Sequence, residues 1–216
     1  MPRRMPRFDR QLLAQAQTAV AIARAGETAH LSGTALVRAA WSTPKLEALY
    51  ELAFLRVFAG WEACLEAVFY RSLCGYASSA GQETLLSGAY YPSVAAAEAA
   101  VLGTRSFVLW HNPNAVVARC QQFIRSGRGY PSLQEITISS NLTRLVHLAS
   151  ARHRIVHDQA DAKRKFDDAA LHFAGRTYPA SRPGKFLRDW DRSTAPARRW
   201  LEVTISDLTG LASQIV

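Results

Sequence analysis

The chain has 216 residues, of which 49% are hydrophobic, so it is long enough and apolar enough to fold as one globular domain. This composition excludes a disordered chain, and the formal net charge of +9 favours a polyanionic partner such as RNA, DNA or an anionic membrane. Nearly all of the 26 basic residues are arginine, a bias that a solvated basic surface would also explain.

Three cysteines, Cys64, Cys74 and Cys120, are odd in number and fit no metal-binding spacing, which predicts free thiols in a reducing compartment. The basic first ten residues are followed by no apolar segment, so we do not interpret them as a signal peptide. Because no run approaches ~18 uninterrupted apolar residues, we expect no transmembrane helix. The sequence therefore predicts a soluble, cytoplasmic protein with no membrane partner.

Helical signals dominate the first half of the chain. A weak helix is predicted over 9–24, and Thr43-Pro44 marks the start of a long helix over 44–74 that Gly75 ends. The apolar positions of this long helix are spread too widely for a surface helix, which predicts a central core helix. A further weak helix is expected over 93–102, within a loop-rich insertion over 76–112.

The second half has the same character. Asn112-Pro113 opens a helix that Gly127 would end, and Ser139 or Ser140 would cap another that runs to about His157. The stretch 136–138 is strand-like but too short to build a sheet. Weaker helices are expected over 161–174 and 196–214, separated by a connector at 175–194 that is rich in Gly, Pro, Ser and Arg.

These signals predict an all-α fold in one domain over 1–216. Residues 1–40 would form an N-terminal helical extension, and the last helix would pack back onto the helical bundle.

The segment 151–158 carries the clearest chemical signal. Arg152 occupies an apolar helical stripe, where an arginine is costly unless it is paired or lines a cleft. His153 and His157 are four residues apart and share a helix face. Glu62 lies on an apolar stripe of the long helix, so we predict that it is the buried partner of Arg152. The alternative is that Glu62 and Arg152 form an ion pair that only stabilises the fold and has no catalytic role.

The pattern of Arg152, a polar residue and then His157 resembles the signature of the HEPN superfamily, in which the polar position is commonly Asn, Asp or His and is His153 here. The wider chain, from about 45 to 215, is similar to the RiboL-PSP-HEPN branch. The matching stretches besides the motif are Glu51 to Glu62, Leu109-Trp110, and Arg182 to Leu187.

This resemblance implies a HEPN-type bundle that forms a homodimer in which the two motifs face each other across a cleft. Many such proteins are endoribonucleases that act as toxins, in phage defence or in RNA processing, with an antitoxin or regulatory protein as a further partner. The resemblance assigns Arg152 and His157 as the catalytic pair and His153 as an auxiliary residue.

These residue types suit the cutting of RNA without a metal. Histidine, with an ordinary pKa of ~6.5, can take the proton of a ribose 2′-hydroxyl, and arginine can stabilise the charge that develops on the phosphate. No cofactor is required. Four neighbouring basic residues could follow the RNA backbone or could form only a solvated face: Arg154, Lys163, Arg164 and Lys165.

Three other interpretations compete with the nuclease. The spacing of His153 and His157 fits a zinc ligand pair, but an arginine stands where a zinc protease has its glutamate, so we expect no metal. A non-catalytic HEPN adaptor would keep the fold and bind a partner protein or a nucleotide. A purely structural bundle would bury the motif as a polar contact. We assign no role to the remaining histidines, His30, His111, His147 and His172.

Overall fold

The computed structural model describes residues 3–86, 88–125, 130–193 and 195–216. Within these ranges the chain is all-α, as predicted, and its only strands are two residues long each. The helices are α1 (Phe8–Ser32), α2 (Ala35–Ala40), α3 (Thr43–Leu73), α4 (Val94–Leu102), α5 (Pro113–Cys120), α6 (Leu133–Ser140), α7 (Leu142–Val156), α8 (Ala160–Ala174), α9 (Pro183–Arg188) and α10 (Trp200–Ile215). Shorter elements are η1 (Gln121–Arg125), η2 (Pro179–Ser181), β1 (Trp190–Asp191) and β2 (Arg198–Arg199).

The chain forms two compact units. The first comprises Met1–Leu12, Trp61–Val146 and Gly210–Val216, and the second comprises Leu13–Gly60 and His147–Thr209. Because of this division, α1, α3, α7 and α10 each contribute residues to both units. The prediction of a single domain over 1–216 stays a prediction.

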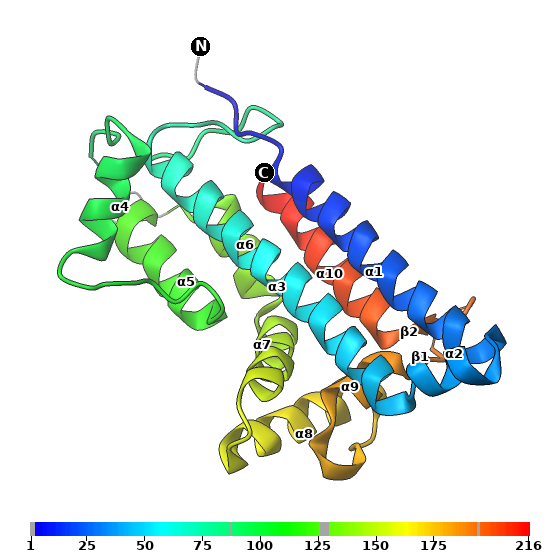
Figure 1. Cartoon of the computed structure of the whole chain (residues 1–216). Helices are drawn as coiled ribbons and strands as arrows, with labels where there is room; N and C mark the ends of the chain where they lie inside the picture. The colour runs from blue at the N-terminus through cyan, green and yellow to red at the C-terminus, as the bar shows by residue number, and fades with distance from the viewer. Residues whose placement is uncertain (1–2, 87, 126–129, 194) are drawn as a thin grey trace. The chain divides into compact units, whose positions relative to one another are not determined.

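An aromatic cluster around Phe186 of α9 forms part of the core of the second unit. The Phe186 ring stacks on Trp200 of α10 with centroids 5.6 Å apart, and it meets Phe166 of α8 edge-on at 6.0 Å. The C-terminal helix α10 lies beside α1 in this unit (Figure 1), where Arg24 of α1 donates a hydrogen bond to Glu202 of α10. The predicted connector at 175–194 therefore contains η2, α9 and β1, and α9 supplies a core residue.

The first unit has an aromatic core around Phe69 of α3. Its ring lies 5.4 Å from that of Trp110 and 6.3 Å from that of Phe123. The stretch at 136–138, strand-like in composition but expected to be too short for a sheet, lies within α6. Ser132 caps this helix by accepting a hydrogen bond from the Glu135 amide, and local capping together with burial outweighs the β-branched composition.

The predicted helix boundaries agree with the structure where strong capping signals occur. The long helix predicted over 44–74 is α3, and Gly75 follows it with a positive φ of 78°. The helix predicted to begin at Ser139 or Ser140 begins instead at Leu142, because α6 occupies those serines. The predicted end of another helix at Gly127 lies outside the described residues.

Two further sequence-based expectations concern membrane-spanning helices and the three cysteines. No helix in the described part of the chain is long and apolar enough to cross a membrane. Cys64, Cys74 and Cys120 are free thiols, as predicted, and burial raises the pKa of Cys64 and Cys120 to about 12.

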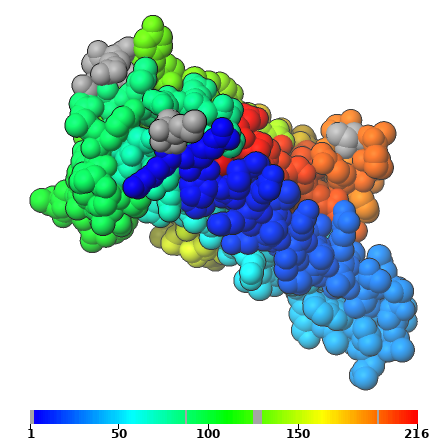
Figure 2. Space-filling model, turned by 90° about the horizontal axis from the view of Figure 1, so that it is seen from above, coloured from blue at the N-terminus to red at the C-terminus, as the bar shows by residue number. Residues whose placement is uncertain are grey.

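Every residue of α2 is exposed, and Figure 2 shows this helix on the surface.

Candidate functional site

The predicted motif lies at the C-terminal end of α7, within the second unit (Figure 1). Arg152 and His153 are half-buried in the last turn, and His157 is exposed one residue beyond the helix. The His157 amide still donates to the carbonyl of His153 at 2.9 Å, so the helical path continues to His157. This local geometry presents both imidazoles at one helix end.

The two imidazoles of the motif lie next to each other. The ring centroids of His153 and His157 are 4.6 Å apart, as their four-residue spacing predicts. Burial is the largest cause that lowers the pKa of His153, and the nearby His157, Lys165 and Arg152 lower it further against the opposing charge of Asp161. Because its pKa lies below the ordinary value, His153 is mostly neutral at pH ~7 and can accept a proton or a hydrogen bond.

The guanidinium of Arg154 is held by contacts within the protein. Its guanidinium donates to the carbonyl of Ser181 at 3.0 Å and to that of His157 at 3.2 Å, and it pairs with Asp158 at 2.9 Å. Only 14% of its side chain is exposed. These bonds tie the end of α7 to η2 and fix the backbone of His157. The role of Arg154 as an RNA contact stays a prediction, and these bonds already engage its Nε and Nη1.

The other predicted RNA-binding residues, on α8, are exposed but paired. Lys163 contacts Asp158 at 3.1 Å, and Lys165 contacts Asp161 at 2.6 Å. Arg164 also pairs with Asp161, at 2.8 Å. Exposed ion pairs of this kind are weak, so a phosphate can compete with the aspartates for these cations, but the aspartates offset much of the positive charge.

The predicted partners Arg152 and Glu62 are both half-buried, and the expectation that both are buried is wrong. Arg152 lies in the last turn of α7, and a long arginine side chain can pack its stem against apolar neighbours while its charged end stays in water. Glu62 belongs to the first unit and Arg152 to the second. Their pairing stays a prediction.

Comparisons with known proteins add nothing to this geometry. No family model, curated protein or solved structure matches the chain. In the described part of the chain, no group of three or more histidine, cysteine or acidic side chains is placed to hold a metal ion.

The structure also reveals a polar contact between α3 and α9 to which the sequence analysis gave no role. The carboxylate of Glu51 accepts a hydrogen bond from the Gly184 amide at 2.8 Å, and Arg182 forms an ion pair with Glu47. Burial is the largest cause that raises the pKa of Glu51, and the adjacent Glu47 raises it further. These residues hold the start of α9, directly after Ser181, to which Arg154 is bonded.

A sequence signal for this contact existed. Glu47 and Glu51 are four residues apart near the start of a long helix, and Pro183-Gly184 is a helix start that leaves no side chain on its second residue. The pairing itself joins positions 133 residues apart, and only the tertiary structure brings them together.

Proposed function

We propose that this protein is a metal-independent endoribonuclease of the HEPN type that cleaves single-stranded RNA. The observation that supports the proposal best is the adjacent pair His153 and His157 beside Arg152 at an exposed helix end. One neutral imidazole within reach of a fixed guanidinium is the minimum that attack by a 2′-hydroxyl requires.

In the proposed reaction, His157 takes the proton of the ribose 2′-hydroxyl because it is the more exposed imidazole. The 2′-oxygen then attacks the adjacent phosphorus, and the bond to the 5′-oxygen of the next nucleotide breaks while Arg152 stabilises the charge on the phosphoryl oxygens. The leaving 5′-oxygen takes a proton from water, and His157 releases its own proton to solvent. The products are a 2′,3′-cyclic phosphate and a 5′-hydroxyl. DNA lacks the 2′-hydroxyl and would not be cut.

His153 is a positioning residue in this proposal. Its ring lies against that of His157 and its pKa is lowered, so it remains neutral and can accept a hydrogen bond while His157 cycles its proton. Arg154 acts indirectly, because it holds the His157 carbonyl and thereby the helix end. A homodimer would bring two such helix ends to one RNA strand, and an antitoxin or other regulatory protein would restrain the activity in a cytoplasmic setting.

The test is incubation of the purified protein with mixed single-stranded RNA in EDTA. The wild type should produce fragments with cyclic phosphate ends and leave DNA of the same sequence intact. His157→Ala and Arg152→Ala should each lower the cleavage rate by ~10²–10⁴, the usual worth of such groups, without loss of the fold. His153→Ala should lower it less.

Matched controls separate chemistry from general damage. His172→Ala removes an exposed histidine of α8, and Arg56→Ala removes an exposed arginine of α3, so both should cut at the wild-type rate. Equal cleavage by wild type and His157→Ala would assign the activity to another site or a contaminant. RNA binding without cleavage by the wild type would favour the alternative, a non-catalytic adaptor.

A further inference from the structure

A buried arginine in the first unit has no ion-pair partner among the described residues. Arg119 of α5 is only 8% exposed, and its Nη1 has no hydrogen-bond partner among the described residues. Its Nη2 donates to the carbonyl of Leu109 at a long 3.4 Å, and its guanidinium lies over the Trp110 ring at 4.4 Å from the centroid. An uncompensated buried cation is costly, which suggests that an anion completes the site.

The groups around Arg119 do not neutralise it. Burial is the largest cause that lowers its pKa, and Cys120 and Tyr70 are the next groups that act on it. Both of these are uncharged at neutral pH, because the pKa of each is raised to about 12. Arg105 is a second positive charge nearby and also lowers the pKa of Arg119. The carboxylate of Glu66 opposes this, but its effect on the pKa of Arg119 is the smallest of those named.

Arg119 lines an open cavity of about 530 Å³ beside the loop that joins α4 to α5 (green in Figure 1). This volume is in the range of ~300–1,000 Å³ that small-molecule sites occupy. Thr104, Arg105 and Ser106 also line it. The apolar part of the wall includes Phe107, which is 67% exposed, and Leu109, which is 42% exposed.

We propose that this cavity binds a small organic phosphate, with the phosphate between Arg119 and Arg105 and an aromatic body against Phe107. Two guanidiniums and two hydroxyls suit a phosphate monoester, which carries a charge of about −1.5 to −2 at pH ~7 and accepts several hydrogen bonds. An exposed phenyl ring offers the kind of face on which a nucleobase stacks. This inference does not depend on the proposed nuclease activity.

Calorimetric titration with adenosine monophosphate tests the site, with adenosine and inorganic phosphate as comparison ligands. The wild type should bind the monophosphate, bind inorganic phosphate more weakly and ignore adenosine. Arg119→Met should weaken binding of the monophosphate by ~10–150-fold, the worth of a hydrogen bond to a charged group. Arg105→Ala, at an exposed position, should weaken it by a few fold, and Arg10→Ala, an exposed arginine that does not line the cavity, should not change it.

Thermal unfolding distinguishes a ligand site from a structural arginine. In phosphate-free buffer, Arg119→Met should melt at the same temperature as the wild type or higher, because the variant removes an uncompensated buried charge. The monophosphate should raise the melting temperature of the wild type and leave that of the variant unchanged. The proposal is overturned if the wild type does not bind the monophosphate, or if Arg105→Ala and Arg119→Met both bind it as the wild type does.

Discussion

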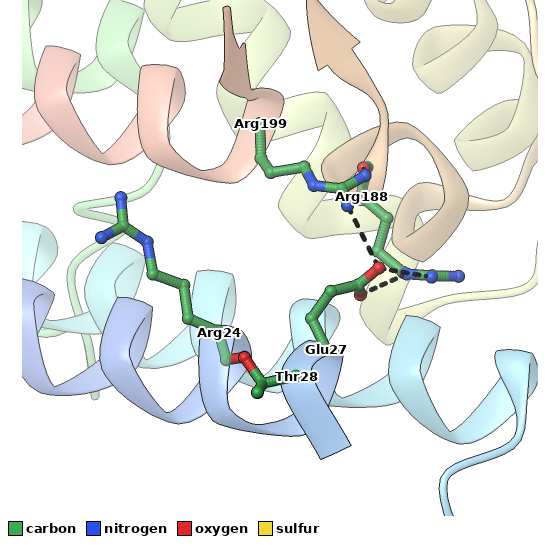
Figure 3. Close-up of polar contacts among 5 residues, drawn as sticks. All are labelled: Arg24, Glu27, Thr28, Arg188 and Arg199. Carbon is green, nitrogen blue, oxygen red and sulfur yellow. Dashed lines mark hydrogen bonds and ion pairs between the residues drawn. The ribbon is translucent and has the colours of Figure 1, made fainter. Parts of the chain in front are cut away.

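At Glu27 of α1, two arginines from distant parts of the sequence meet one carboxylate (Figure 3). Arg188 donates to both of its oxygens, at 2.9 and 3.1 Å, and Arg199 donates to one of them at 3.1 Å, whereas Arg24 points away. Burial alone would raise the pKa of Glu27, but Arg188 and Arg199 outweigh it and hold the pKa below its usual range. Glu27 therefore links α1 to the end of α9 and to β2, which directly precedes α10.

We expect Glu27→Ala to lower the free energy of unfolding by ~2–4 kcal/mol, because it leaves two largely buried guanidiniums without their carboxylate. The matched control is Glu202→Ala. The partner of Glu202 is Arg24, whose side chain is 68% exposed, so this variant should lose less than ~1 kcal/mol of unfolding free energy. Urea unfolding monitored by circular dichroism measures both. Equal losses in the two variants would show that burial of the Glu27 cluster contributes nothing extra.

Gly184 of α9 lies against the backbone of α3. A Cβ added there would lie 2.5 Å from the carbonyl oxygen of Glu47, a distance at which something must shift. We expect Gly184→Ala to destabilise the protein by ~1–3 kcal/mol through overpacking. Gly210→Ala, in the middle of α10 with nothing within 4 Å of the new Cβ, should instead stabilise it by ~0.5–1 kcal/mol. Denaturant midpoints that shift in the same direction would contradict this account.

At the scale of helices, α7 and α8 meet through a second pair of histidines. The rings of His147 and His172 stack with centroids 4.4 Å apart. Burial is the largest cause that lowers the pKa of His147, His172 lowers it further, and Asp168 opposes them. His147 therefore binds a proton more readily in the unfolded chain than in the folded one. Its neutral form contributes stability that is fully present above pH ~6.5, the ordinary pKa of histidine, and is lost as the pH falls below that value.

We accordingly expect the unfolding free energy of the wild type to fall between about pH 7.5 and about pH 5. In His147→Gln the fall should be smaller, because a side chain that titrates against folding has been removed. Urea unfolding at both pH values measures the difference. A variant that loses as much stability as the wild type on acidification would show that protonation of His147 does not oppose this contact.

For the whole molecule, the proposed nuclease predicts a dimer. Light scattering should give about twice the chain mass of 23.8 kDa, because the proposed active site is built from two helix ends. Exposed apolar side chains are available for an interface, among them Leu31 at 67% and Leu36 at 82% exposure. A monomer at micromolar concentration would argue against a composite site. Leu36→Glu then tests whether this particular surface is the interface.

The sequence by itself determined the helical class and the core of the candidate site. Caps and helix breakers act within a few residues, so Thr43-Pro44, Gly75 and Asn112-Pro113 marked real helix ends. The contact between His153 and His157 also follows from helical spacing alone. Where local signals were weak, the prediction was wrong: the helix expected to begin at Ser139 or Ser140 begins at Leu142, because α6 occupies those serines.

The tertiary structure decided which charged groups are free to act. Arg154 was indistinguishable from its basic neighbours in the sequence, but its bond to Ser181 across 27 positions makes it structural. Arg119 carried no sequence signal, and its burial without an ion-pair partner in the described part of the chain is visible only in the fold. The physical reason is that helix formation is governed by neighbours along the chain, whereas the cost or use of a charge depends on what folding places around it.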